Sequence, residues 1–323
     1  MTPDGTVAVL QSLASLDGEI YTYDVASDTL ELATTLGDAT MNLATAVSQS
    51  GRITAFYGVP VVGGFFSEAD GWTEIASPFA EGCDVQTAGA WDVSADGSVV
   101  VGFAWNLCSP QAFRWTDTGG DGTLLPLDVL GQSQGMSPPT NRATVVSDDG
   151  AIAAGFAQNG PVDRSPAVWS ADGTGFLLDP DDMDAPGEIL SISADGSVVA
   201  GIWAQNAFKW TEADGRVELG QLPTSLPGEP CFPNAMSADA SLIFGGCGDA
   251  FFGVPVAFVW SEAEGMRSLE EIAAANGLTP PDGFRFSSVL AASADGTVIV
   301  GVANDDLFNQ RSFVLRLPAS ALR

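Results

Sequence analysis

Four cysteines are the residues whose spacing most directly suggests chemistry. Cys83 and Cys108 flank one Ser-Ala-Asp-Gly turn motif, and Cys231 and Cys247 flank a related motif, so that in both repeats one cysteine precedes the first strand of the hairpin and the other follows the second. Because an antiparallel hairpin brings its two open ends together, each pair is placed for a local disulfide. We therefore predict the bonds Cys83–Cys108 and Cys231–Cys247. The alternative is buried free thiols, whereas zinc fits poorly because the chain has no C-x-x-C spacing and no histidine.

The absence of histidine removes several classes of catalysis. Ser-His-Asp and Cys-His nucleophile systems, His-ligated zinc and a His general base are all excluded in their usual forms. Paired carboxylates, as in glycoside hydrolysis, remain available. With 41 Asp and Glu residues, however, a chance pair near a cleft is expected. The sequence therefore predicts no catalytic residue.

The densest acidic loop is the best candidate for a metal site. It contains Asp179, Asp181, Asp182, Asp184 and Glu188. Hard oxygen ligands crowded in a turn suit Ca²⁺, although the spacing lacks the D-x-D-x-D-G pattern with a distal Glu. We therefore expect a solvated acidic loop and no cofactor, and calcium bound by these residues is the alternative.

The charge balance is strongly acidic, with a formal net charge of −30 from 41 acidic and 11 basic residues. Such a chain is repelled by phosphate, and it shows no basic stripe, so we expect neither nucleic-acid binding nor membrane insertion. The sequence shows no apolar run of about 18 residues. It shows no signal peptide either, since the first repeat begins at Thr2. The acidity fits a salty or extracellular setting, or divalent-cation binding.

An internal repeat of about 50 residues supplies the elements that position these groups. Its core is a Ser-Ala-Asp-Gly turn, a β-branched run and a glycine, clearest at 94–102, 193–201 and 293–301. Weaker copies complete a set of turns that end at Gly5, Gly51, Gly97, Gly150, Gly196, Ala240 and Gly296. In such a turn Gly tolerates positive φ and Asp bonds nearby backbone. We therefore expect the Asp-Gly pairs to be structural.

A short aromatic strand follows each clear turn, as in Ala112-Phe113-Arg114-Trp115-Thr116. An acidic turn and a short apolar strand come next. The aromatic strand places tryptophans at one repeat position, and we expect these side chains to pack in the core rather than to stack on sugars: Trp115, Trp169, Trp210 and Trp260.

Each repeat thus predicts four antiparallel strands, A to D, joined through the Asp-Gly turn between A and B. One such unit cannot bury both of its faces, whereas stacked units can. We predict an all-β β-propeller of about seven four-stranded blades that forms a single domain, 1–323. The predicted blades span 1–38, 39–80, 81–131, 132–180, 181–223, 224–272 and 273–323.

Three irregularities are expected. The first blade lacks strand A, because the chain begins at the A–B turn, and the last blade has no clear strand D. Ser268 and Glu271 form a capping-box pattern, and Asn276-Gly277 is a helix-ending pair. This pattern predicts one short helix in the connection between blades 6 and 7.

The motifs resemble those of the HAF family of extracellular repeat proteins. The resemblance rests on the S-A-D-G-(x)-V-V-x-G element, the A-F-[RK]-W-T element and the closing segment from Gly265 to Pro318, and it covers about residues 40–318. It implies an exported bacterial protein. It implies no reaction, because fold and location do not determine function.

The function expected from the sequence is that of an exported, non-enzymatic scaffold or binding module for protein or glycan at the cell surface. The alternative is a carboxylate-dependent glycoside hydrolase or polysaccharide lyase with its site at the channel mouth. Ligand and oligomeric state are left open.

Overall fold

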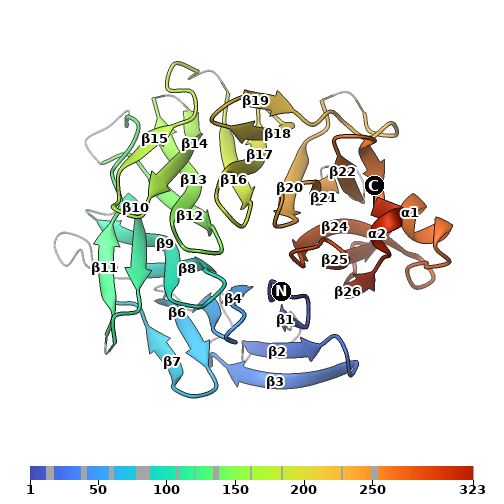
Figure 1. Ribbon diagram of the computed structural model, residues 1–323, viewed down its shortest axis with the longest axis horizontal. Helices are drawn as coiled ribbons and strands as arrows, with labels where there is room; N and C mark the ends of the chain where they lie inside the picture. Colours follow the sequence, from blue (N-terminus) through green and yellow to red (C-terminus); the bar gives the residue numbers. More distant parts are fainter. Residues whose placement is uncertain are drawn as a thin grey trace. The chain divides into compact units, whose positions relative to one another are not determined.

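The described residues form seven antiparallel sheets, five of four strands and two of three, and the fold is an all-β seven-bladed propeller (Figure 1). The computed structural model describes residues 1–11, 18–37, 42–57, 62–77, 88–106, 109–119, 121–133, 138–160, 162–182, 185–226, 228–248 and 254–322. Contacts divide the chain into two compact units, Met1–Thr2 with Thr6–Glu188, and Pro3–Gly5 with Ile189–Arg323.

Unit 1 carries four sheets, each built from consecutive strands. Blade 1 is β1 (Val7–Gln11), β2 (Glu19–Asp24) and β3 (Thr29–Thr35); blade 2 is β4 (Asn42–Val47), β5 (Ile53–Tyr57), β6 (Val62–Ser67) and β7 (Gly71–Glu74). Blade 3 is β8 (Ala88–Val93), β9 (Val99–Asn106), β10 (Ser109–Thr116) and β11 (Thr123–Pro126); blade 4 is β12 (Asn141–Val146), β13 (Ile152–Asn159), β14 (Val162–Ser170) and β15 (Gly175–Leu177).

Unit 2 carries the other three sheets, except that the first two residues of β16 count with unit 1. Blade 5 is β16 (Gly187–Ile192), β17 (Val198–Trp203), β18 (Asn206–Thr211) and β19 (Gly215–Glu218). Blade 6 is β20 (Cys231–Met236), β21 (Leu242–Cys247), β22 (Val256–Ser261) and β23 (Gly265–Ser268); blade 7 is β24 (Phe284–Ala292), β25 (Val298–Asp305) and β26 (Gln310–Arg316).

Hydrogen bonds within the Ser-Ala-Asp-Gly motif and to the residue that follows it stabilise the A–B turn. In blade 3 the Ser94 hydroxyl donates to the Asp96 carboxylate at 2.8 Å and accepts the backbone N–H of Val99 at 3.0 Å. The N–H of Gly97, at φ 81°, donates to the Ser94 carbonyl at 2.9 Å. Hydrogen bonds, led by that from the Ser98 N–H, lower the pKa of Asp96. The motif's Ser and Asp are therefore structural, as expected.

The second residue of the motif ties neighbouring blades together through its backbone. In unit 1 the N–H of Ala95 donates to the Asp148 carbonyl at 3.0 Å. In unit 2 Ala238 donates to Ala294 at 2.7 Å, and Ala294 donates to Pro3 at 2.6 Å. A side chain at this position is not needed for the contact, which explains why a small residue suffices there.

The glycine that ends each β-branched run allows strands A and B to approach closely. A Cβ on Gly102 would lie 1.9 Å from the Gly89 carbonyl oxygen, and one on Gly245 would lie 1.9 Å from the Phe232 oxygen. Phe113 and Phe258 lie opposite these glycines on the C strands and are fully buried. The repeat-position tryptophans 115, 169 and 260 are buried as expected, whereas Trp210 is half-buried.

The irregular ends agree with the sequence expectations. Blade 1 consists of strands B to D, and blade 7 of strands A to C. Helix α1 (Leu269–Ala275) follows β23 and ends at Asn276, but the Ser268 side chain makes no cap hydrogen bond. A second helix, α2 (Ala319–Leu322), was not expected from the sequence. Within the described residues, neither helix is long and apolar enough to cross a membrane.

Candidate functional site

The A strands of unit 1 carry a β-bulge at a recurring position, and the bulged residue points to the next blade. Register shifts occur between Ala44 and Ala46 in β4, Ala90 and Asp92 in β8, and Ala143 and Val145 in β12. Two of the bulged residues are threonines that bridge blades: Thr45 Oγ1 donates to the Ala90 carbonyl at 3.2 Å, and Thr144 Oγ1 to Glu188 Oε1 at 3.3 Å. A bulge re-aims a side chain in this way because it inserts one extra residue into the strand.

Blade 3 places an aromatic ring, Trp91, where the neighbouring blades have threonine. Its ring stacks on Phe56 with centroids 4.9 Å apart and planes 20° apart. The guanidinium carbon of Arg142 lies 4.2 Å from the Trp91 centroid and 4.9 Å from that of Phe156. Arg164 lies 4.8 Å from the same Phe156 ring. The sequence difference at one bulge thus creates a cation–π arrangement across blades 3 and 4.

Glu188 joins the two arginines. One carboxylate oxygen pairs with Arg142 and the other with Arg164. The Glu188 side chain is 6% exposed, that of Arg142 17% and that of Arg164 49%. Burial lowers the pKa of the Arg142 guanidinium, Glu188 opposes that shift, and the charge of Arg164 adds to it. We call Trp91, Arg142, Phe156, Arg164 and Glu188 the arginine–aromatic cluster.

The cluster can hold an anion or a planar polar group. Its two guanidinium groups share one carboxylate, so the cluster itself carries one net positive charge within a chain of net charge −30. A guanidinium is planar and presents several N–H donors in a fixed fork, which suits carboxylate, sulfate or phosphate groups. Arg164, half-exposed, is the member that solvent and a ligand can reach.

Among the described carboxylates of unit 1, Asp92 has the most strongly altered pKa. Burial raises its pKa to about 7, and the charge of Asp148 adds to this rise. Its two oxygens accept the backbone N–H groups of Val93 at 2.9 Å and Val146 at 2.8 Å, so it also connects blades 3 and 4. Burial also raises the pKa of Asp148. An acid that titrates near neutrality is a possible proton donor, and this is the feature that favours a catalytic role.

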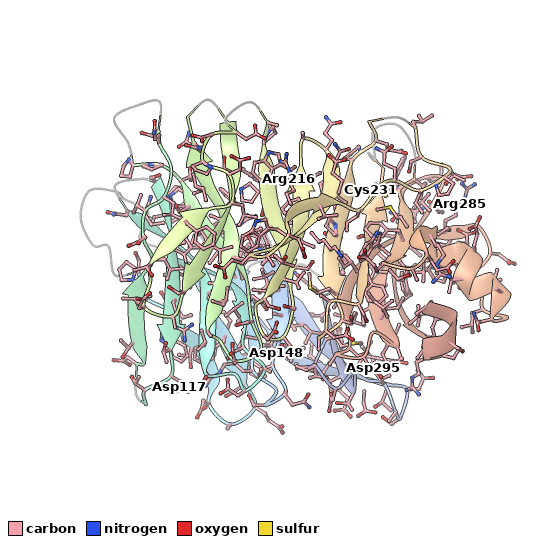
Figure 2. All side chains as sticks on the ribbon, turned by 45° about the horizontal axis from the view of Figure 1, so that its top comes forward. Asp117, Asp148, Arg216, Cys231, Arg285 and Asp295 are labelled. Atoms are coloured by element: carbon pink, nitrogen blue, oxygen red, sulfur yellow. A yellow bond between two sulfur atoms is a disulfide. The ribbon has the colours of Figure 1, made fainter. Side chains whose placement is uncertain are left out.

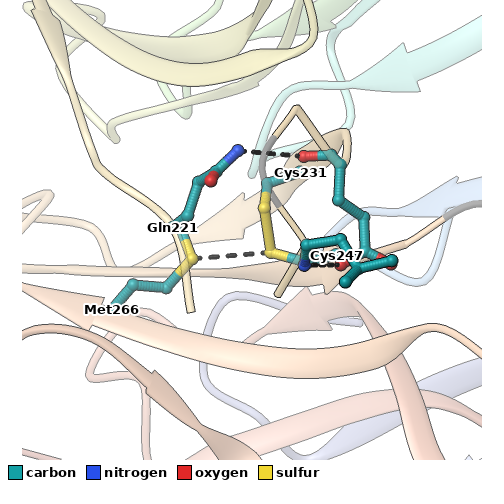
Figure 3. The surroundings of a disulfide bond; sticks show 6 residues. Gln221, Cys231, Cys247 and Met266 are labelled. Atoms are coloured by element: carbon teal, nitrogen blue, oxygen red, sulfur yellow. Dashed lines mark hydrogen bonds between the residues drawn. A yellow bond between two sulfur atoms is a disulfide. The ribbon is translucent and has the colours of Figure 1, made fainter. Parts of the chain in front are cut away.

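One disulfide is present among the described residues, between Cys231 and Cys247 (Figure 3). The two residues are register partners at the ends of β20 and β21, with Cα atoms 4.0 Å apart. Both are buried, and the Cys247 sulfur lies 3.5 Å from the sulfur of Met266. This pairing is the one expected from the blade register. Cys83 and Cys108 lie outside the described residues, so their bond stays a prediction.

The residues of the predicted calcium loop do not share one environment. Glu188 is engaged by the two arginines, whereas Asp179 accepts the backbone N–H of Asp181 at 3.3 Å. Asp184 lies outside the described residues. In the described part of the chain, no three acidic or cysteine side chains are grouped for a metal. Calcium binding by Asp179, Asp181 and Asp182 stays a prediction, and Glu188 has a different role from the one expected.

Sequence reasoning missed the arginine–aromatic cluster. Arg142 and Arg164 are two of only 11 basic residues, and Trp91 occupies a position that is threonine in the neighbouring repeats. That substitution within the repeat is the signal that could have revealed the cluster. Its members come from three blades, and no local spacing relates them.

Comparison with known proteins supports the fold. The β-propeller domain of Cps50 (Swd1) from Myceliophteria thermophila aligns with a TM-score of 0.63 at 11% identity, over 98% of this chain and 96% of that one. The chain described here is therefore a β-propeller as well. Oligogalacturonate lyase from Vibrio parahaemolyticus aligns with a TM-score of 0.60 at 14% identity, over 99% of this chain and 89% of the lyase. TolB from Acinetobacter baumannii aligns with a TM-score of 0.52 at 15% identity. The alignment covers 81% of this chain but only 62% of TolB, so this chain spans less than two thirds of TolB.

These likenesses establish the fold alone, since all three identities are low. No family model matches the chain, and no curated protein matches it. The resemblance to HAF repeats therefore rests on the sequence motifs. Propellers with such different names show that the fold does not decide the activity.

Proposed function

We propose that this protein is an exported, non-enzymatic binding propeller that recognises a protein or glycan at the cell surface through the arginine–aromatic cluster. The observation that carries the proposal is the half-exposed guanidinium of Arg164, fixed by Glu188 on one side and by the Phe156 ring on another. A charged group held in this way on strands is preorganised, so a ligand spends little free energy on ordering it.

The neighbouring groups suit an acidic ligand. Arg164 supplies donors for a carboxylate or sulfate, Arg142 lies behind it on the same Glu188 carboxylate, and the partly buried Trp91 ring lies beside Arg142. Arginine and tryptophan are the residue types that most often dominate binding energy at interfaces. An acidic glycan or an acidic segment of a protein combines the charge and the apolar contact that these groups favour.

Three features support export. The net charge of −30 suits a salty or extracellular medium, the Cys231–Cys247 bond suits an oxidising compartment, and the repeat motifs resemble an exported family. The three features are independent of one another.

The alternative is an enzyme, a carboxylate-dependent glycoside hydrolase or polysaccharide lyase. Asp92 favours it, because an acid with a pKa of about 7 is suited to proton transfer near neutral pH. Against it, both oxygens of Asp92 are occupied by backbone N–H groups, which is the environment of a structural carboxylate.

A glycan array with a parallel cleavage assay separates the two. The array includes neutral, uronic and sulfated glycans, and each bound glycan is then incubated with the protein and analysed for reducing ends and unsaturated products. We expect binding to acidic glycans, or to acidic proteins in a matched protein array, without cleavage. Cleavage that is lost in Asp92→Asn but retained in Asp148→Asn would overturn the non-enzymatic proposal. Absence of any ligand on both arrays would count against binding by the cluster.

A further inference from the structure

Arg164 uses only part of its guanidinium for contacts within the protein. Its Nη1 pairs with Glu188 Oε2, and its central carbon lies 4.8 Å from the centroid of the Phe156 ring. Among the described residues, no hydrogen bond or ion pair involves Nε or Nη2 of this arginine. Because a guanidinium presents five N–H donors in a planar fork, the edge formed by Nε and Nη2 is available to a second acceptor.

Solvent reaches Arg164 but very little of the apolar surface around it. Arg164 is exposed, whereas the next two residues of β14, Ser165 and Pro166, are buried. The Phe156 ring is buried as well, and the Trp91 ring is partly buried. A protein partner usually covers apolar area at the centre of its contact, and the described residues beside Arg164 offer little of it. A charged edge with little apolar surface suits a polar ligand such as an acidic sugar.

The charges around Arg164 are mixed. Figure 2 shows Asp117 and Asp148 toward one end of unit 1, where the A–B and C–D turns lie. Arg164 is near the start of β14 and therefore lies toward the opposite end of its strand. The acidic loop 179–182 also approaches that end, because one of its carbonyl groups accepts a hydrogen bond from Asn159 Nδ2 at 3.1 Å. Long-range attraction of a polyanion is therefore not expected, and the site suits one carboxylate held at short range.

The Thr144 hydroxyl fixes the direction of the Glu188 carboxylate. Its Oγ1 accepts the Nε–H of Arg142 at 3.4 Å and donates to Glu188 Oε1 at 3.3 Å. Because Arg142 pairs with the same oxygen, Oε1 has two partners and Oε2 is the oxygen that contacts Arg164. The bulge itself is tightly packed, since a Cβ on Gly155 of β13 would lie 2.9 Å from Thr144 Oγ1.

Loss of the Thr144 hydroxyl would leave Glu188 Oε1 with one partner fewer and allow it to turn toward Arg164. A carboxylate that contacts one guanidinium with both of its oxygens forms the stronger, bidentate arrangement. Glu188 would then occupy Nη2 of Arg164 as well as Nη1, and the available edge would be lost. The threonine at this bulge therefore prevents Arg164 from being saturated within the protein.

We propose that the Nε–Nη2 edge of Arg164 binds the carboxylate of a uronic acid in an acidic glycan, and that Thr144 is the positioning residue that keeps this edge available. A carboxylate is planar and can lie in the plane of the guanidinium, whereas a sulfate or phosphate places a third oxygen outside that plane. Because the site is the arginine–aromatic cluster, the assignment rests on the proposed function and adds the class of sugar and the atoms that recognise it.

Nuclear magnetic resonance of the isotope-labelled full chain measures this contact directly, with sodium glucuronate as the probe. The arginine Nε–H signal that is absent from Arg164→Lys identifies Arg164. We expect this signal to shift saturably with glucuronate but not with its methyl ester, which has nearly the same shape without the charge. No saturable shift, or an equal shift with the ester or with a glucose sulfate ester, would overturn the carboxylate assignment. Equal affinity for N-acetylglutamic acid amide would overturn the glycan assignment in favour of acidic protein segments.

Thr144→Val tests the positioning role, because valine keeps nearly the shape of threonine and removes the hydroxyl. We expect the affinity for glucuronate to fall by about fivefold, as for the loss of one hydrogen bond, and Thr144→Ser to restore it. Thr45→Val is the matched control, since Thr45 occupies the same bulge position in blade 2 and donates to the Ala90 carbonyl at 3.2 Å. It should leave the affinity unchanged. Unchanged affinity in a folded Thr144→Val protein would overturn the role of Thr144.

Failure of this assignment can be distinguished from failure of the proposed function. If the strongest ligand from the arrays binds equally well to Arg164→Ala, the cluster is not the ligand site and the proposed function fails. If that ligand requires Arg164 but binds equally well after its carboxylates are esterified, the cluster is the ligand site and the uronic acid assignment alone is wrong. The ester comparison needs no variant at Thr144, so it remains decisive even if Thr144→Val does not fold.

Discussion

The guanidinium of Arg142 lies over the ring of Trp91, with its central carbon 4.2 Å from the ring centroid. The contact joins the A strand of blade 4 to the bulge of blade 3. Because the same guanidinium also pairs with Glu188, a charge that would otherwise be costly to bury is compensated on two sides. The cluster is therefore a structural junction as well as the proposed binding site.

Glu188→Gln should destabilise the protein strongly. The change leaves Arg142 largely buried without its carboxylate, and breaking one side of a buried ion pair costs about 3 kcal/mol. Urea unfolding at neutral pH measures the difference. Glu262→Gln is the matched control, because Glu262 is 81% exposed in its pair with Lys209 and its loss should cost about 0.5 kcal/mol. Equal effects for the two variants would show that Glu188 is not the buried partner described.

The pH dependence of the protein's stability should reflect the protonation of the Asp92 carboxyl group. Its pKa rises from 3.8 to about 7 on folding, so the folded protein binds this proton more tightly than the unfolded chain does. Stability relative to Asp92→Asn should therefore fall as pH rises from about 4 to about 7 and stay level outside that range. The asparagine loses one backbone hydrogen bond, but that cost is independent of pH. A wild-type-minus-variant difference that is flat across this window would contradict the account.

The Cys231–Cys247 bond should contribute measurable stability. Its sequence separation of 16 residues implies about 3 kcal/mol from loop-closure entropy. The double variant Cys231→Ala with Cys247→Ala should lower the free energy of unfolding by that amount under non-reducing conditions. Adding reductant should destabilise the wild type more than this variant. If reductant affects both equally and the variant is as stable as the wild type, the bond has no role in stability.

Non-reducing peptide mapping of exported protein tests the full cysteine prediction. We expect one peptide pair that links Cys83 to Cys108 and another that links Cys231 to Cys247. Linkage of either of the first two to either of the last two would contradict the blade register from which the pairing was predicted.

The sequence predicted those parts of the fold that depend on local repetition. The Ser94 to Gly97 turn, the buried Phe113 and helix α1 all follow from short motifs whose hydrogen bonds and packing lie within one blade. Among the described residues the sheets of blades 1 and 7 have three strands, as the weaker repeat pattern in those two blades predicted.

The residues of the candidate site could not be predicted in the same way, because they depend on contacts between blades. Trp91, Arg142 and Glu188 meet only after three blades have formed, and nothing in their spacing marks them. Helix α2 is four residues long and is held by the burial of Leu322, which is a tertiary effect. The Ser268 side chain makes no cap bond although the motif is present, which shows that a capping pattern can mark a helix start without its hydrogen bond.

Calorimetric titration tests the central claim, that the arginine–aromatic cluster is the ligand site. The strongest acidic ligand from the arrays is titrated into wild type, Arg164→Ala and the control Arg285→Ala. Arg285, in blade 7, is 59% exposed, compared with 49% for Arg164. We expect Arg164→Ala to weaken binding by at least about tenfold, the loss typical of one charge-assisted contact, and Arg285→Ala to leave it unchanged. Equal affinity of wild type and Arg164→Ala would contradict the assignment of the site.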